Sequence, residues 1–142
     1  MTSKIEFLMV NQISVPFKNT DNGTGLMEHI GQITFYRNRL VIEFEKKDAI
    51  MGLYHTAIET VEVPLEMVLS LELKKGWFFT KLTLAARQIK AIEDLPGRDG
   101  RDWTVKIRKK DRDAAADLVS AANMQLSELR LRMLDSSFGD EL

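Results

Sequence analysis

The sequence predicts a mainly β domain of about seven strands followed by one C-terminal α-helix. Three observations predict this class: short stretches that alternate apolar and polar residues, turn formers between them, and one uninterrupted helical periodicity near the C-terminus. A length of 142 residues fits a single domain that buries its core without disulfides or metals. We therefore expect one domain over residues 1–142, in which the helix covers an open end of a strand-built barrel.

Residues 1–25 predict one or two strands and a flexible loop. Apolar residues alternate over 5–9 and again over 13–17, and Pro16 interrupts the second stretch. Residues 19–25 are nearly all turn formers without periodicity, so we expect the loop there.

Residues 26–108 predict the strand-rich part of the barrel. A hairpin is expected around Arg37-Asn38, where Asn38 tolerates the positive φ of a tight turn. Pro64 indicates an edge strand or a strand end. Residues 67–73 and 103–107 alternate cleanly, whereas residues 85–95 fit neither a strand nor a helix clearly.

Residues 111–134 predict the helix, and residues 135–142 predict a polar, frayed tail. Aspartates at the start can cap the helix, and three alanines follow them. The expected core stripe, with Leu118 beside it, is Ala115, Val119, Ala122, Leu126, Leu129 and Met133.

This order of elements resembles the pleckstrin-homology-like (PH-like) barrel, in its bacterial type. The similarity covers residues 13–126, and it rests on five segments. They are the strands over 31–36 and 40–44, the strand ending in Pro-Leu within 61–68, the hairpin at 74–76 and the last strand at 103–107. The resemblance implies a seven-stranded antiparallel barrel, or two orthogonal sheets, plugged by the helix. It also implies binding to lipids, peptides or proteins rather than one reaction.

The phosphoinositide-binding members of that family carry a basic residue late in the first strand and a basic-x-Arg pair early in the second. Lys18 matches the first position. Residues 26–30 carry Glu28 and no arginine, so the second position does not match. The sequence therefore predicts no specific inositol-phosphate site.

Chemistry-bearing motifs are missing from the sequence. His29 and His55 stand in no triad or metal-ligand spacing, and Gly23-Thr24-Gly25 lacks the rest of a phosphate-binding motif. There is no cysteine, and the formal charge is −1. We expect a protein that is not an enzyme, has no cofactor or metal, and binds no nucleic acid.

Basic residues gather in residues 98–112, where seven basic and three acidic side chains give a local charge of +4. This segment is interpreted either as a surface for anionic head groups or an acidic partner, or as solvated strand-edge charges that prevent aggregation.

The aromatic run Trp77-Phe78-Phe79 breaks the alternation of its strand. Three consecutive rings cannot all face the core, so at least one faces outward. Lys74 and Lys75 precede the run, which favours contact with a membrane interface or a protein. The alternative is that another part of the chain covers the outward ring.

The end of the helix carries more apolar residues than a barrel plug needs. Leu131 and Leu134 fall off the core stripe, while Leu129 and Met133 continue it beyond the length needed. We expect this surplus to support self-association rather than remain exposed.

The leading functional hypothesis is a non-catalytic interaction module that binds protein or peptide and self-associates into a homo-oligomer. Its expected contacts are Trp77, Phe78, Leu129, Leu131, Met133 and Leu134, oriented by Lys74, Lys75, Lys106, Arg108, Lys109 and Lys110. One alternative is peripheral binding to anionic membrane lipids through Lys74, Lys75, Trp77 and residues 98–112. The other is a small-ligand-binding domain or an enzyme of unknown reaction.

A cytoplasmic location is expected. The longest apolar run near the start, residues 7–10, is far shorter than the roughly 20 residues of a membrane span.

Overall fold

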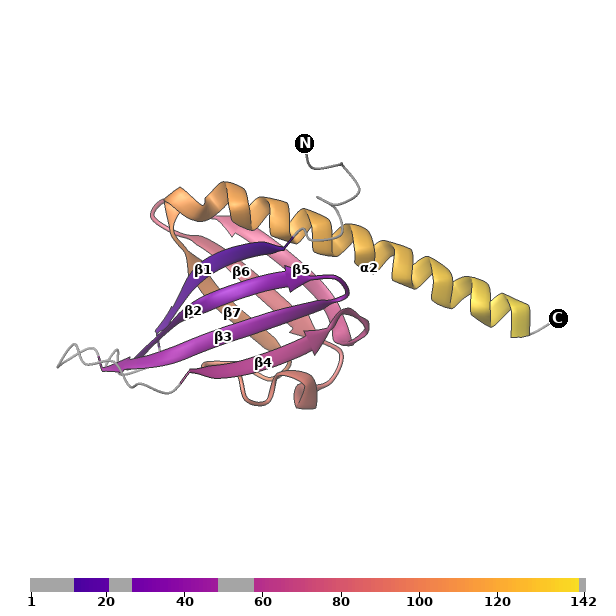
Figure 1. Ribbon diagram of the computed structural model, residues 1–142, viewed down its shortest axis with the longest axis horizontal. Helices are drawn as coiled ribbons and strands as arrows, with labels where there is room; N and C mark the ends of the chain where they lie inside the picture. The colour runs from indigo at the N-terminus through magenta and orange to yellow at the C-terminus, as the bar shows by residue number, and fades with distance from the viewer. Residues whose placement is uncertain (1–11, 21–26, 49–57, 141–142) are drawn as a thin grey trace, which may run out of the picture.

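The computed structural model describes residues 12–20, 27–48 and 58–140, and it contains seven strands and one long helix. Figure 1 shows the helix lying across one side of the strands. The strands are β1 (Ile13–Thr20), β2 (Met27–Tyr36), β3 (Arg39–Asp48), β4 (Glu59–Pro64), β5 (Val68–Lys75), β6 (Thr80–Ala86) and β7 (Asp102–Ile107). The helix is α2 (Arg112–Asp140), and three short 3-10 turns are η1 (Leu65–Met67), η2 (Ile89–Ile92) and η3 (Lys109–Asp111).

The strands form one antiparallel sheet in the order β4-β3-β2-β1-β7-β6-β5. In Figure 1 this sheet is folded into two layers, with β1–β4 in front and β5–β7 crossing behind them. The layers are joined where β1 pairs with β7, at Lys18 and Lys106. The predicted fold class is confirmed, with one refinement: the two expected sheets are a single continuous sheet, and the barrel stays open between β4 and β5.

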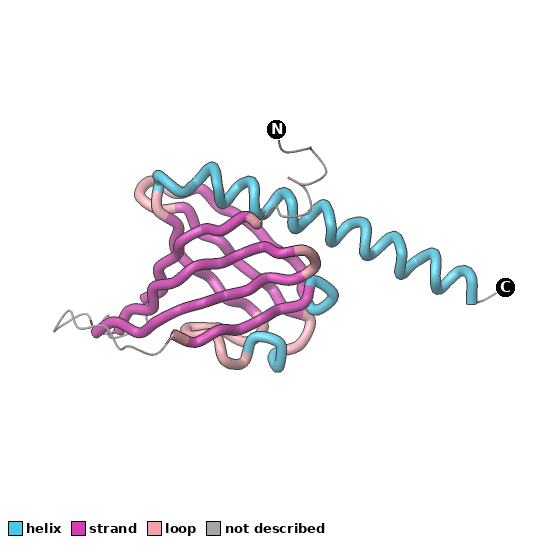
Figure 2. The backbone as a smooth tube through the Cα atoms, in the orientation of Figure 1, coloured by secondary structure: helices cyan, strands magenta, loops and turns pink. Residues whose placement is uncertain are grey.

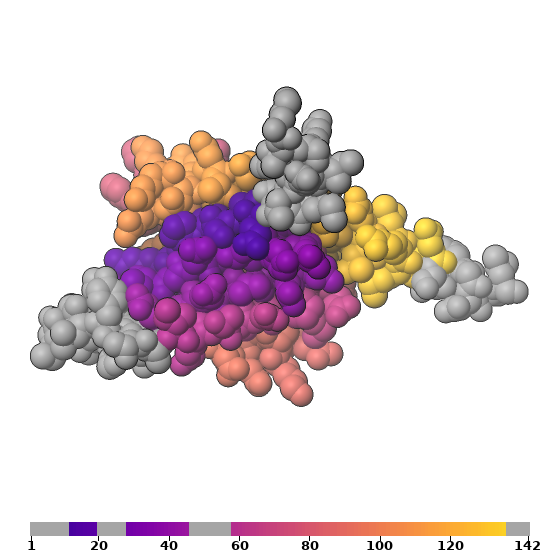
Figure 3. All heavy atoms as spheres, in the orientation of Figure 1, coloured from indigo at the N-terminus to yellow at the C-terminus, as the bar shows by residue number. Residues whose placement is uncertain are grey.

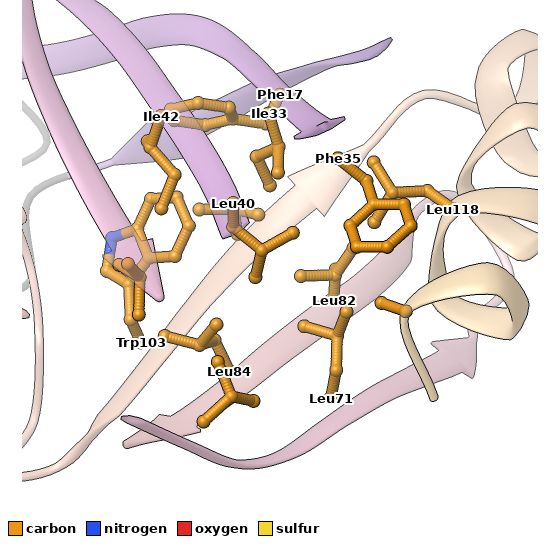
Figure 4. Packing of buried hydrophobic residues seen from close by; sticks show 14 of the residues in the cluster. Phe17, Ile33, Phe35, Leu40, Ile42, Leu71, Leu82, Leu84, Trp103 and Leu118 are labelled. Atoms are coloured by element: carbon orange, nitrogen blue, oxygen red, sulfur yellow. The ribbon is translucent and has the colours of Figure 1, made fainter. Parts of the chain in front are cut away.

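The core lies between the two layers and consists mainly of the inward residues of the alternating strands, with residues of α2 such as Leu118 packed against them (Figure 4). Trp103 is its largest fully buried side chain, as its place on the apolar face of the last strand predicts. The Trp103 ring meets the edge of Phe17 at 5.1 Å, and its Nε1 donates to the Pro96 carbonyl at 2.9 Å. The indole therefore buries a large apolar surface without leaving its polar atom unsatisfied.

The β2–β3 hairpin turns at Arg37-Asn38 as predicted, but the residue with positive φ is Arg37, at 58°, and not Asn38. The guanidinium of Arg37 lies 5.2 Å from the centre of the Tyr36 ring. This cation–π contact offsets part of the cost of a left-handed backbone at a residue with a Cβ.

Gly31 allows β2 and β3 to approach closely at the centre of the front layer. A Cβ at this position would lie 2.0 Å from the Glu43 carbonyl oxygen. Because any side chain would push the strands apart, glycine is required here for packing rather than for a turn.

The N-terminal part of helix α2 closes one opening of the folded sheet. Its buried residues are Ala115, Leu118, Ala122 and Leu126. Figure 2 shows the helix continuing well past the strands. It ends at Asp140, so residues 135–140 are helical rather than the predicted tail. Extension is favourable because each added residue gains a hydrogen bond once the helix is nucleated, and no proline interrupts it.

Residues 85–95, which the sequence left unassigned, finish β6 and form the turn η2. Ile92 and Leu95 are buried there and complete the core under β4 and β6. The strand expected over residues 5–9, the Gly23-Thr24-Gly25 turn and His55 lie outside the described residues.

Candidate functional site

The β5–β6 hairpin carries an exposed aromatic loop, which we call the aromatic tip (Trp77, Phe78 and Phe79). The Gly76 amide donates to the Phe79 carbonyl at 2.9 Å, leaving Trp77 and Phe78 as a two-residue loop. Trp77 is 95% exposed and Phe78 82% exposed. The sequence predicts at least one outward ring, and within the described chain no segment covers these two. In Figure 3 the pink atoms of this hairpin project beside the orange first turns of α2.

A row of four lysines crosses the outer face of the sheet directly behind the aromatic tip. Cross-strand partners place Lys74 opposite Lys81, Lys81 opposite Lys106, and Lys106 opposite Lys18. We call these four residues the lysine row. Three interstrand spacings make the row about 14 Å wide. Directly opposed residues have Cβ atoms about 5 Å apart, so the row concentrates like charges at a cost to stability.

The contacts of the lysine row leave most of its charge available. Lys18 forms an ion pair with Glu28 at 3.1 Å, and the Lys106 Nζ lies 5.2 Å from the centre of the Phe79 ring. Within the described residues, no carboxylate pairs with Lys74, Lys81 or Lys106. The contact of Lys106 joins the row physically to the aromatic tip.

The start of α2 adds further positive charge at the same end of the molecule. Arg108, Lys109 and Lys110 follow β7 and are exposed. The Arg112 Nε donates to the Thr80 Oγ1 at 3.1 Å, which ties the first turn of the helix to the base of the tip. Residues 74–81 and 106–113 together hold eight basic and two acidic side chains, a formal charge of +6.

The predicted basic segment 98–112 is divided by β7 between two ends of the molecule. Arg108, Lys109 and Lys110 lie with the aromatic tip, whereas Arg98 and Arg101 precede β7 at the opposite end. The guanidinium of Arg98 donates to the Glu93 and Gly100 carbonyls, and that of Arg101 donates to the Arg87 carbonyl. These two arginines therefore stabilise loops and do not add to the positive charge around the aromatic tip.

The structure brings Lys74, Lys75 and Lys106, which belong to the alternative membrane hypothesis, close to the aromatic tip. Arg98 and Arg101, which that hypothesis also includes, lie at the other end of β7. Two members of the lysine row, Lys18 and Lys81, were not among the predicted contact residues. Alternation places Lys81 on the outer face of its strand, but only the pairing register of β5, β6, β7 and β1 aligns the four lysines.

The free edge of β5 is occupied by side chains from α2. Asn123 Nδ2 donates to the Leu71 carbonyl at 3.1 Å, and Arg130 donates to the Leu69 carbonyl. A groove between β5 and α2 is lined by Leu71–Lys74 together with Ala116, Val119, Ser120 and Asn123. A peptide adding as a strand to β5 would have to displace both of these hydrogen bonds.

A second groove, of about 390 Å³, lies beside the Lys18 end of the lysine row. Lys18 and Arg108 line one part of it and Glu43 and Glu45 another, and Ile30 is among the apolar residues between them. Because both signs of charge line this groove, it does not concentrate anions as the lysine row does.

One of the two histidines, His29, belongs to the described part of the chain. His29 lies on β2, nearly buried, with its ring 6.1 Å from that of Phe44. No group of three or more His, Cys, Asp or Glu side chains converges among the described residues.

The predicted apolar surplus lies on the part of α2 beyond the strands. Leu129 still packs against the core cluster, while Leu131, Met133 and Leu134 are each more than half exposed. Among the described residues, no helix has the length and apolar character needed to cross a bilayer.

Comparison of the chain with family models, with curated proteins and with solved structures gave no match.

Proposed function

We propose that this protein is a non-catalytic, PH-like interaction module that binds the surface of anionic membranes through the aromatic tip and the lysine row. The observation that carries the proposal is the juxtaposition of two nearly fully exposed rings, Trp77 and Phe78, with four lysines aligned across neighbouring strands. The order and pairing of the strands support the PH-like part of the proposal.

Each half of this surface supplies one of the two forces that hold peripheral proteins on membranes. Aromatic side chains are enriched at the membrane–water interface, where an amphipathic ring is both partly buried and hydrated. Lysines near an anionic leaflet contribute about 1 kcal/mol each. A single weak anchor gives only reversible binding, so the combination is what makes the contact effective.

The membrane accounts for this surface better than a peptide added to a sheet edge. The β5 edge is occupied by Asn123 and Arg130. The β4 edge carries exposed Glu59 and Glu62 and ends at Pro64, features that protect an edge from further pairing. The expected cytoplasmic location fits the proposal, because the cytoplasmic leaflet is the one that carries anionic lipids.

Co-sedimentation with vesicles tests the proposal. We expect binding to phosphatidylcholine–phosphatidylserine vesicles but not to phosphatidylcholine alone, and weaker binding as salt is raised. Lys81→Glu lowers the charge of the surface by two units and should reduce the affinity for these vesicles about 30-fold. The matched control is Lys90→Glu, an exposed lysine in η2 at the opposite end of β6, which should bind as the wild type does.

The aromatic half of the surface has its own variant, Trp77→Ala/Phe78→Ala, which should weaken vesicle binding at least about tenfold through lost apolar contact. Ile89→Ala removes an exposed apolar residue from η2 and should have no effect. The proposal would be overturned if the wild type did not bind vesicles, or if neither Trp77→Ala/Phe78→Ala nor Lys81→Glu reduced the binding. Either result would favour the protein-binding hypothesis for the tip.

A further inference from the structure

Helix α2 carries a second apolar stripe that does not belong to the core. It runs through Met124, Ser127, Leu131 and Leu134, at intervals of three, four and three residues. Met124, Leu131 and Leu134 are 64%, 62% and 54% exposed. This spacing is that of the a and d positions of a heptad repeat, with a at 124 and 131 and d at 127 and 134.

The barrel lies on the opposite side of the helix from this stripe. At 3.6 residues per turn, Leu131 lies about 140° around the helix axis from the buried Leu126. Ala122, Leu126 and Leu129, which pack into or against the core, fall at the c and f positions, on the outside of any coil formed by the stripe. A partner helix can therefore pack on the stripe without displacing the barrel.

Charges beside the stripe favour a second copy of the same helix in parallel orientation. Arg130 occupies a g position and Asp135 the e position five residues later, so a parallel pair places each arginine near the other copy's aspartate. An antiparallel pair that joins Met124 to Leu134 would instead oppose Arg130 to Arg130, and Glu128 to Glu128. The Arg130 guanidinium donates one N–H to the Leu69 carbonyl, and its other N–H groups can donate to the aspartate of the second copy.

We propose that the protein forms a homodimer through a short parallel coiled coil of α2, with Met124, Leu131 and Leu134 at its seam. The seam covers only about two heptads, which an isolated peptide could not sustain. Here the first half of the helix is already folded against the barrel and the rest continues from it as helix, so association orders little new backbone.

A parallel dimer has one consequence that rests on the proposed function. Both aromatic tips lie near the first turn of their helices, so a parallel pair presents two tips and two lysine rows toward one membrane. The second contact then becomes intramolecular, and the overall affinity exceeds that of either tip alone.

Light scattering after size exclusion, over a concentration series and without lipid, tests the dimer. We expect a dimer for the wild type and a monomer of unchanged helical circular dichroism for Leu131→Asp/Leu134→Asp. Met133→Asp is the matched control, since Met133 is 54% exposed, in the same turn region but off the stripe. It should remain a dimer.

Orientation is tested by crosslinking, because the chain contains no cysteine of its own. Ser127→Cys should form an intermolecular disulfide on mild oxidation, since a parallel pair places each d residue next to the same residue of the other protomer. Met133→Cys should not. A wild type that is monomeric throughout, a dimer that survives Leu131→Asp/Leu134→Asp, or a Ser127→Cys protein that does not crosslink would each overturn the proposal. Since no lipid is present, these outcomes are independent of the membrane result.

Discussion

Lysines placed directly opposite one another are unfavourable for folding, and Lys81 has such a neighbour on both sides. Lys74 is its partner on β5, and Lys106 is its partner on β7. A surface that only needed solubility would alternate its charges across strands, which stabilises a sheet. The lysine row therefore lowers the stability of the fold, which is typical of residues retained for binding an anionic surface.

Lys81→Gln should raise the free energy of unfolding by about 0.5 kcal/mol at low salt, because it removes two like-charge contacts. The same change should lower the affinity for anionic vesicles about fivefold. Urea denaturation and vesicle co-sedimentation measure the two effects. Lys90→Gln serves as the control, and the interpretation would be wrong if Lys81→Gln destabilised the fold or left binding unchanged.

Residue-level prediction from sequence succeeded where local rules decide the outcome. Trp103 is in the core and the Trp77-Phe78-Phe79 run reaches solvent, both as alternation indicates. Prediction from sequence failed where the position of a residue relative to neighbouring strands determines its role. The contribution of Lys81 depends on the register of β6 against both of its neighbours, which the sequence of one strand does not contain.

The elements themselves show how α2 does more than plug the sheet. Asn123 and Arg130 reach from the helix to the free edge of β5, and they satisfy two carbonyls that would otherwise face solvent or another strand. Covering an edge in this way is a recognised protection against unwanted strand pairing. The helix therefore stabilises β5 through polar contacts as well as through its buried stripe.

Asn123→Ala should lower the free energy of unfolding by about 1 kcal/mol, since it removes the hydrogen bond to the Leu71 carbonyl in a half-buried position. Gln125→Ala changes an exposed amide on the same helix and should cost little by comparison. Urea denaturation of both variants measures the difference. Equal stability of the two variants would show that this contact does not hold the edge of β5.

Element boundaries were predictable only in part. The start of the helix was placed within one residue, because the aspartates and alanines mark it locally. Its end was not, because the polar composition after 134 suggests fraying while the helix in fact continues to Asp140. In the β2–β3 hairpin, the turn was found but its left-handed residue was not: it is Arg37, whose guanidinium contacts the Tyr36 ring, and not the neighbouring asparagine.

At the scale of the whole molecule, the folded sheet gathers charges that are scattered along the sequence. The near-neutral chain carries a formal charge of +6 in the two segments that meet at the aromatic tip. The sequence alone shows a basic segment at 98–112. Only the fold shows that half of this segment joins the β5–β6 hairpin and that Arg98 and Arg101 do not.

The most direct test of the central claim uses the two tryptophans of the chain, because they differ completely in exposure: Trp77 is 95% exposed and Trp103 is 1% exposed. On anionic vesicles that contain brominated lipids, we expect the Trp77 emission to shift to shorter wavelength and to be quenched, as the tip enters the interface. Trp77→Phe, which retains an aromatic ring, should still bind but show neither change, since Trp103 stays in the core. A wild-type protein that co-sediments with these vesicles, yet shows no shift and no quenching, would contradict the account.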